Sequence, residues 1–298
     1  MSTPKISVVI PAYNAAGVVA ACIDSILCDE NVPGGREIIM VDNNSADATR
    51  AIISKFPVRY LHQPMRGAAA ARNLGVLHSR GEYVAFTDAD CIVERGWLAQ
   101  LLRGFDDVSV ACVGGEIAVP PAESDLEHYC VKYNPISQEN AVEREVNLFP
   151  HVITANAMFR RSVFDKVGLF DERFPSAGGE DLDLGWRVHR AGYRMKYSPS
   201  ARVVHRHKSS IRQLFRQHYR YGYGWTVIVR KHKDLFKNAG PSCWGVYPED
   251  IRAFRAAVRD YVGSVCTRGL TQHTRFCFYH LIRQLGEYSG KFAATVSR

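Results

Sequence analysis

Short apolar runs alternate with helix-patterned segments over the first ninety residues, and this alternation limits the folds open to the chain. The apolar runs fit buried strands, whereas the segments between them repeat apolar residues at helical spacing. We predict strands over 6–10, 37–41, 58–61 and 83–86, and helices over 18–27, 48–55 and 68–77. Strands joined by helices of this length form a right-handed sheet covered on both faces. The sequence therefore predicts an α/β fold with a mostly parallel central sheet flanked by helices.

Two carboxylates separated by one residue, Asp88 and Asp90, follow the predicted strand over 83–86. Ligands of open α/β folds bind at the carboxyl edge of the sheet, where this pair is expected. Carboxylate oxygens suit Mg²⁺ or Mn²⁺, and Mg²⁺ sites commonly combine one or two carboxylates with substrate phosphates. The pair alone also fits a solvated turn. Because neither G-x-G-x-x-G nor a P-loop follows the first strand, a dinucleotide-binding fold and a P-loop NTPase are excluded.

Charge divides the chain into an acidic and a basic part. The first 186 residues carry 16 Lys+Arg against 25 Asp+Glu, whereas the remainder carries 22 against 5. An acidic portion followed by a basic one predicts an anionic partner for the second.

Cysteine usage and hydropathy indicate the compartment. The eight cysteines show no C-x-x-C spacing, and several lie in apolar patterns, where a free thiol behaves as a small hydrophobe. No run approaches the ~20 apolar residues that span a bilayer, and the first residues lack the pattern of a signal peptide. We therefore expect a reduced, cytoplasmic protein.

Five segments of the sequence carry the remaining information. They are SVVIPAYN at 7–14, EIIMVDNNSADAT at 37–49, RGAAAARNLG at 66–75, YVAFTDAD at 83–90 and GGEDLDLGWRVHRAGYR at 178–194. In this order they resemble the motifs of the family 2 glycosyltransferases, which have the GT-A fold. The resemblance implies a nucleotide-sugar-binding catalytic domain over 1–207. A basic, aromatic-rich helical region follows over 208–298.

The resemblance implies a nucleotide-base pocket behind the first two strands. Asp42 ends the second strand and would accept a hydrogen bond from N3–H of uracil, with Asn44 as a further polar contact. Tyr13 offers a stacking surface. The pocket residues after the first strand are Pro11, Ala12, Tyr13 and Asn14. An ordinary strand-to-helix loop after the first strand, and a turn at Asp42, are the alternatives.

The same resemblance assigns residues to the phosphates. Arg72 would reach the nucleotide or its phosphates, and Asp88 and Ala89 would lie beside the nucleotide. Asp88 also approaches the metal, which Asp90 binds directly. The implied cofactor is a divalent cation, Mn²⁺ or Mg²⁺.

The resemblance also implies that a histidine after the acidic helix completes the metal shell. His205 follows a strand-like segment over 201–204, and His207 is the second candidate. Imidazole suits Mn²⁺ better than Mg²⁺. We assign His205 as the ligand, and the alternative is a structural histidine.

Glu180 and Asp181 precede a predicted helix over 182–191 and follow two glycines. The helix dipole favours the ionised form of a carboxylate at this place, as a general base requires. The resemblance implies that Asp181 deprotonates the acceptor hydroxyl in an inverting transfer, with Glu180 or Asp183 positioning the acceptor. The alternative is that all three acids only cap the helix.

Two C-terminal segments are basic and amphipathic. Arg212, Arg216 and Arg220 recur at helical spacing among aromatic residues, and three further arginines recur over 251–262. Such helices fit an anionic membrane surface near a lipid-linked acceptor. The alternative is a solvated helix face whose apolar side packs on the catalytic domain. Because no nucleic-acid-binding motif accompanies these residues, we expect no nucleic acid partner.

These observations predict a metal-dependent, inverting glycosyltransferase of cell-surface polysaccharide or glycoconjugate biosynthesis. We expect a UDP-linked donor and, as acceptor, a hydroxyl of a glycan or lipid-linked glycan. The protein would be cytoplasmic, or peripheral on the inner face of the membrane. Two other classes stay open. One is a nucleotidyltransferase making nucleotide sugars, although residues 10–17 lack its Gly-rich basic loop; the other is a non-catalytic sugar-nucleotide-binding or membrane scaffold protein.

Overall fold

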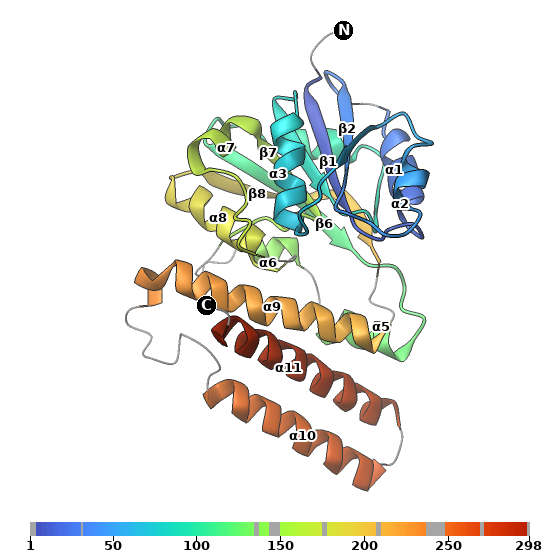
Figure 1. Cartoon of the computed structure of the whole chain (residues 1–298), viewed down its shortest axis with the longest axis vertical. Coiled ribbons are helices and arrows are strands. Elements are labelled where there is room, and N and C mark those ends of the chain that lie inside the picture. Colours follow the sequence, from blue (N-terminus) through green and yellow to red (C-terminus); the bar gives the residue numbers. More distant parts are fainter. Residues whose placement is uncertain are drawn as a thin grey trace. The chain divides into compact units, whose positions relative to one another are not determined.

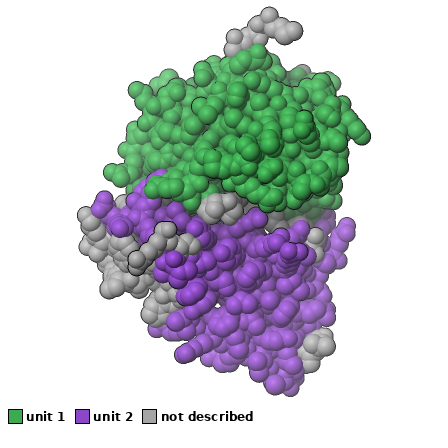
Figure 2. Space-filling model, viewed as in Figure 1, with its two compact units in different colours: residues 1–120, 136–176, 180–206 green, residues 121–135, 177–179, 207–298 purple. Residues whose placement is uncertain are grey.

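The computed structural model describes residues 4–30, 32–133, 137–142, 150–174, 178–206, 210–236, 248–268 and 271–296. They belong to two compact units (Figure 2). The N-terminal unit comprises residues 1–120, 136–176 and 180–206, and the C-terminal unit comprises 121–135, 177–179 and 207–298. The sequence predicted a single division after residue 207. In the structure, two short segments from earlier in the chain also belong to the C-terminal unit.

An eight-stranded sheet forms the centre of the N-terminal unit, with the strand order β3-β2-β1-β4-β7-β6-β8-β5. The strands are β1 (Ile6–Ala12), β2 (Arg36–Asp42), β3 (Arg59–His62), β4 (Tyr83–Thr87), β5 (Cys91–Val93), β6 (Val110–Ala118), β7 (Asn156–Arg160) and β8 (Arg194–His205). Four pairs are parallel, namely β1–β2, β1–β4, β2–β3 and β6–β8. Three are antiparallel, namely β4–β7, β6–β7 and β5–β8. The predicted α/β fold with a mostly parallel sheet is confirmed.

Strand β1 is buried on both faces, which explains its unbroken apolar run. Val8 and Ile10 belong to one hydrophobic core, together with side chains of α1 (Val19–Leu27) and α4 (Trp97–Arg103). Val9 belongs to the core on the other face, where α3, α7 and α8 contribute. These helices span Ala68–His78, Arg161–Val167 and Glu180–Arg190, and Figure 1 shows α3 crossing in front of the strands. The short helices α2 and α6 span Thr49–Ile53 and Gln138–Val142.

The sequence did not predict β5, β6 or α4. In β6, Gly114 and Gly115 interrupt the apolar pattern because other groups occupy the space of their missing side chains. A Cβ on Gly114 would lie 1.7 Å from Nε2 of Gln138, and one on Gly115 would lie 2.2 Å from the carbonyl oxygen of Ala201. The two glycines are therefore required by long-range packing, which the local sequence pattern does not reveal.

The C-terminal unit is helical, as predicted. Its helices are α5 (Asp125–Tyr133), α9 (Ile211–Lys231), the short 3-10 helix η1 (Lys233–Phe236), α10 (Pro248–Arg268) and α11 (Gln272–Val296). Helix α11 lies between α9 and α10 (Figure 1). A Cβ on Gly222 of α9 would lie 2.1 Å from the carbonyl oxygen of Glu287, so the two backbones are in direct contact. None of the helices in the described stretches is both long and apolar enough to cross a membrane.

Candidate functional site

The carboxyl ends of β1, β2 and β4 lie at one edge of the sheet, because these strands are parallel neighbours. Ala12 at the end of β1 is in register with Asp42 at the end of β2. Asp88 follows directly after β4. The edge that holds these residues is the one where ligands of open α/β sheets bind.

Asp42 is almost fully buried at this edge, with 2% of its surface exposed. One carboxylate oxygen accepts from the backbone N–H of Ser45 at 3.0 Å, and the other accepts from the hydroxyl of Tyr60 at 3.0 Å. Burial, and then the hydrogen bond and charge of Asp42, raise the pKa of Tyr60, which keeps the phenol a donor. The carboxylate is therefore held in a fixed orientation by two donors, and its role in base binding stays a prediction.

The loops after β1 and β2 hold one another through hydrogen bonds. Asn14 accepts from the backbone N–H of Ala46 at 2.9 Å and donates its own N–H to Ser45 Oγ at 3.0 Å. The N–H of Ala15 donates to Thr49 Oγ1 at 2.7 Å. Asn14 and Asn44 have φ angles of 48° and 61°, in the left-handed region that Asn tolerates better than most residues. Asn14 and Asn44 therefore also have a structural explanation. Both adopt positive φ angles, and Asn14 joins the two loops through its hydrogen bonds.

Tyr13 differs from its neighbours because its side chain is largely accessible. It is 43% exposed, whereas Ala12 is 1% exposed. The guanidinium of Arg66 lies 4.3 Å from the centroid of the Tyr13 ring. The ring can therefore offer a stacking surface, with Arg66 as a cationic neighbour.

Arg72 connects the acid pair after β4 with the acids of α8. Its guanidinium lies 3.0 Å from Oδ1 of Asp88 and 2.8 Å from Oε1 of Glu180. Both Arg72 and Glu180 are only 2% exposed. Burial alone would lower the pKa of Arg72, but the charges of Asp88, Glu180 and Asp181 outweigh burial and raise it. Three carboxylates therefore surround one permanently charged guanidinium.

A second cluster combines Asp90 with His205. The pairing of β5 with β8 sets Cys91 opposite His205, and Oδ1 of Asp90 lies 3.6 Å from Nε2 of His205. Potential ligand atoms of Asp90, Cys91 and His205 all lie within 4.8 Å of one another. The structure thus brings His205 to the acid pair, although the two are far apart in the sequence. His207 lies outside the described residues.

The donor set tests whether this cluster fits a divalent cation. Carboxylate oxygen and imidazole nitrogen are ligands of Mn²⁺, whereas a thiol must first lose its proton. Burial, followed by the charges of Asp88 and Asp90, raises the pKa of Cys91 well above its ordinary value. The buried Cys91 is therefore a poor ligand, and the residues that fit Mn²⁺ or Mg²⁺ are Asp90 and His205, with Asp88 two residues before Asp90 in the chain.

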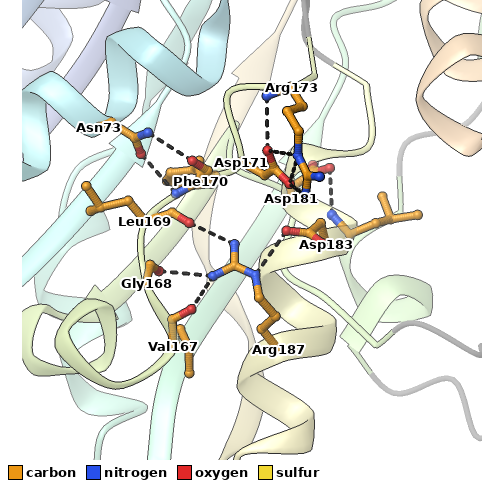
Figure 3. Close-up of polar contacts among 11 residues, drawn as sticks. Asn73, Val167, Gly168, Leu169, Phe170, Asp171, Arg173, Asp181, Asp183 and Arg187 are labelled. Carbon is orange, nitrogen blue, oxygen red and sulfur yellow. Dashed lines mark hydrogen bonds and ion pairs between the residues drawn. The ribbon is translucent and has the colours of Figure 1, made fainter. Parts of the chain in front are cut away.

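The acids of α8 have separate environments (Figure 3). Asp183 is fully buried and accepts from Nε of Arg187 at 3.0 Å. Arg187 also donates to the carbonyl oxygens of Val167, Gly168 and Leu169. Asp183 and Arg187 thus fix the segment between α7 and α8, which gives Asp183 a structural role that the sequence did not reveal.

Asp181 is less confined than its neighbours. Its Oδ1 accepts from the adjacent backbone N–H of Leu182 at 3.0 Å, and the residue is partly exposed (Figure 3). Gly178 and Gly179 precede it with φ angles of 145° and 109°, which favour glycine. Of the three acids in the first turn of α8, Asp181 therefore has the surroundings that suit a group meeting a substrate.

The side chain of Asn73 in α3 binds the backbone of the segment after Gly168 (Figure 3). Its side chain donates to the carbonyl oxygen of Phe170 at 2.9 Å and accepts from the N–H of Phe170 at 2.9 Å. It also donates to Glu172 at 2.8 Å. Sequence reasoning missed Asn73 and Cys91, because neither stands in a pattern that signals its distant partner.

Comparisons with known proteins agree with this geometry. The profile of the family described as Glycosyl transferase family 2 matches residues 7–168. A pre-mycofactocin glycosyltransferase of Mycobacterium tuberculosis is 32% identical over 239 residues, which are 77% of this chain and 48% of that protein. Glycosyltransferase AglE of Haloferax volcanii is 30% identical over 205 residues, 65% of this chain and 64% of that protein. The chain thus matches about half of the first relative's length and under two thirds of the second's.

A solved structure extends the likeness to the whole fold. The mannosyltransferase PcManGT from Pyrobaculum calidifontis, in complex with GDP-Man and Mn²⁺, superposes with a TM-score of 0.62 at 19% identity. The match covers 96% of this chain and 87% of that chain. This likeness establishes the GT-A type of fold.

Proposed function

The chain belongs to glycosyltransferase family 2, and from that premise we propose that it is an inverting enzyme. It transfers a sugar from a nucleoside-diphosphate donor to a hydroxyl group. One observation carries the proposal: the guanidinium of Arg72 contacts both Asp88, in the acid pair after β4, and Glu180, directly before Asp181. Such a contact supports a site in which the leaving group and the general base are held by one rigid set of charges.

Asp181 is the proposed general base. Its carboxylate lies in the first turn of α8, where the helix dipole favours a negative charge. It would take the proton of the acceptor hydroxyl while that oxygen attacks the anomeric carbon from the side opposite the diphosphate. The bond between the anomeric carbon and the diphosphate oxygen breaks, and the proton stays on Asp181. Glu180 is buried against Arg72, so its contribution is to hold Arg72 and the start of α8.

Asp88, Asp90 and His205 are the proposed holders of a divalent cation, Mn²⁺ or Mg²⁺. When bound, such a cation neutralises charge on the departing nucleoside diphosphate. The 3.6 Å separation of Asp90 and His205, and the chemistry of their ligand atoms, support this assignment. Ala89, between the two acids, would bring its backbone beside the nucleotide.

The donor pocket is proposed behind β1 and β2. Pro11 and Ala12 would line it, Tyr13 would stack on the base, and Asp42 would accept from an N–H of the base. Uracil N3–H suits such an acceptor, so we propose a UDP-linked donor. Guanine also presents N–H donors, and the GDP-Man in the complex of PcManGT makes GDP-sugars the comparison to include.

The proposed acceptor is a hydroxyl of a glycan or lipid-linked glycan, in the biosynthesis of a cell-surface polysaccharide or glycoconjugate. The exposed Arg212, Arg216 and Arg220 recur along α9 and support a peripheral position on an anionic, inner membrane face.

A nucleotide-sugar screen tests the proposal. We would measure thermal unfolding of the full chain with UDP- and GDP-sugars, each with Mn²⁺, with Mg²⁺ and with a chelator. A donor at 100 times its dissociation constant adds about 2.7 kcal/mol. We expect stabilisation that needs the cation, is lost in Asp90→Asn and is kept in Asp165→Asn, a control at an exposed position. Stabilisation by no nucleotide sugar, or equal stabilisation with the chelator, would contradict the proposal.

The released product distinguishes the rival enzyme class. A glycosyltransferase frees the nucleoside diphosphate from the donor, whereas a nucleotidyltransferase consumes a nucleoside triphosphate and frees pyrophosphate. We expect only the first reaction.

A further inference from the structure

Helix α10 carries apolar side chains on an exposed face. Ile251, Val258, Val262 and Val265 are 39%, 36%, 52% and 38% exposed. They follow one another at i, i+7, i+11 and i+14, so they lie within one narrow face of the helix. We call these four residues the α10 stripe. Exposed apolar side chains gathered in a row need an explanation, whereas scattered ones do not.

A different face of α10 makes its contacts with α11. Ala257 and Ser264 are buried, and Ser264 Oγ lies 2.9 Å from Thr274 Oγ1 of α11. The ring of Phe254 stacks on that of Tyr288, with 6.3 Å between centroids. Because α11 lies between α9 and α10, α10 is the outer helix of these three (Figure 1). The α10 stripe is therefore not the face by which the helix packs.

Three arginines follow the other edge of the α10 stripe. Arg252, Arg255 and Arg259 are exposed, and at 100° per residue they fall beside the stripe, on the side away from the packing face. Asp260 falls nearly opposite the stripe, and Nε of Arg259 lies 3.6 Å from its Oδ1. An ion pair between exposed side chains is weak in water and leaves a cation able to meet another anion. The helix thus presents an apolar row with a cationic row beside it.

We propose that this face of α10 lies on the surface of an anionic bilayer. The α10 stripe would enter the boundary between headgroups and acyl chains, and the three arginines would contact lipid phosphates. Membrane binding itself does not depend on the proposed function. Only its purpose does, which is to bring the enzyme to a lipid-linked acceptor.

The size and charge of the surface favour a membrane over a protein partner. Four side chains on one helix fall far short of the ~800 Å² per partner that a stable protein interface buries. A bilayer has no such threshold, since each apolar side chain and each arginine adds to partitioning separately. The charge of the arginine row is complementary to anionic headgroups.

Vesicle binding by the full chain tests the cationic row. We would sediment the protein with vesicles of phosphatidylcholine alone, and with vesicles that also contain phosphatidylglycerol, without nucleotide sugar. The variant Arg252→Gln, Arg255→Gln, Arg259→Gln should bind the anionic vesicles roughly a hundredfold more weakly. Its matched control, Arg59→Gln, Arg95→Gln, Arg103→Gln, removes the same charge from exposed positions of the N-terminal unit and should bind nearly as wild type.

A fluorescent reporter tests the apolar row. Val262→Trp should shift its emission to the blue on anionic vesicles and be quenched by lipids brominated on their acyl chains. Val258→Ser, Val262→Ser should weaken vesicle binding severalfold, with an unchanged melting temperature, because both side chains are exposed. Melting temperatures of all variants keep a folding defect apart from a binding defect.

Three outcomes would overturn the inference. Equal loss in the two arginine variants would make net charge responsible and not α10. An unshifted Val262→Trp emission on vesicles would keep the α10 stripe in water. A blue shift without vesicles that follows protein concentration, with a dimer in light scattering, would make the stripe an interface between two copies. Because binding is measured without donor, its failure leaves the transferase proposal intact, and inactivity of the enzyme leaves the vesicle result intact.

Discussion

The two units of this protein differ in the kind of contact that stabilises each one internally. In the N-terminal unit, buried charged groups join distant segments, as Arg72 does between Asp88 and Glu180. In the C-terminal unit, the helices pack closely at glycines, which have no side chain to keep the backbones apart. A Cβ on Gly222 would lie 2.1 Å from the carbonyl of Glu287, and one on Gly290 would lie 1.9 Å from that of Tyr219.

The first kind of contact can orient reacting groups, whereas the second kind only stabilises the fold. Charged networks fix the direction of each carboxylate, which a reaction with a charged leaving group requires. Glycine contacts fix the distance between helices and carry no chemistry. We therefore expect substitutions in the first unit to alter turnover, ligand affinity or, at its buried ion pairs, stability, and substitutions in the second to alter stability and surface binding.

The largest expected effect is on turnover. Asp181→Asn should lower kcat by about 10²–10⁴-fold, because a general base contributes that much. The dissociation constant of the nucleotide with Mn²⁺ should stay within about twofold, since Asp181 is not among the proposed metal ligands. Steady-state kinetics and calorimetric titration measure the two quantities. Unchanged kcat would remove Asp181 from the mechanism.

The next effect is on the buried charges. Arg72→Met leaves Glu180 buried without its cation, and breaking a buried ion pair costs about 3–5 kcal/mol of unfolding free energy. The double variant Arg72→Met, Glu180→Met should recover part of that loss. Arg80→Met is the control, because Arg80 is largely exposed in its pair with Glu37 and should cost at most about 1 kcal/mol. Equal losses in Arg72→Met and Arg80→Met would contradict the importance of the buried network.

Glycine contacts can be tested by adding one methyl group. A Cβ on Gly224 would lie 1.7 Å from the carbonyl oxygen of Gly178, within the C-terminal unit. Gly224→Ala should lower the unfolding free energy by about 1–3 kcal/mol. The control Gly263→Ala, also in a helix but with nothing within 4 Å of the added Cβ, should raise it by up to about 1 kcal/mol. A neutral Gly224→Ala would disprove the close approach.

A buried histidine makes the C-terminal unit sensitive to acid. Burial, followed by the charges of Arg283 and His280, lowers the pKa of His218 from 6.5 to about 3. Below pH 6.5 the unfolded chain binds a proton that the folded chain refuses, so the contribution of His218 is complete above pH 6.5 and falls with pH towards 3. Between pH 7 and pH 5 the loss is about 2 kcal/mol.

Urea unfolding at both pH values measures this loss. His218→Gln should remove most of the difference between the two pH values, whereas His128→Gln, at an exposed position of the same unit, should not change it. If the unfolding free energy falls by the same amount from pH 7 to pH 5 in His218→Gln and in the wild type, the acid sensitivity belongs to other groups.

The sequence predicted the first half of the sheet well because β1, β2 and β4 are buried on both faces or nearly so, and their apolar runs are continuous. It also predicted that Asp42 and Asp88 lie where strands end, and the structure confirms these positions. It did not predict β6. Gly114 and Gly115 of this strand are required because Gln138 and Ala201, which are distant in the chain, occupy the space that their side chains would fill.

The partners of the site residues were also beyond the sequence. Nothing near Arg72 indicates that it pairs with Glu180, 108 residues away. Asp181 and Asp183 are the same residue type in the same helical turn, and the sequence does not show that Asp183 is buried against Arg187 whereas Asp181 is partly exposed. Long-range pairing decides such roles, and local patterns do not record it.

The anomeric configuration of the transferred sugar tests the central claim most directly. Slow hydrolysis of the donor found in the screen needs no knowledge of the acceptor, and proton NMR at early times reads the configuration of the released sugar. The account predicts release with the configuration opposite to that of the donor, and loss of this reaction in Asp181→Asn. Release with the donor's own configuration would contradict a direct displacement assisted by Asp181.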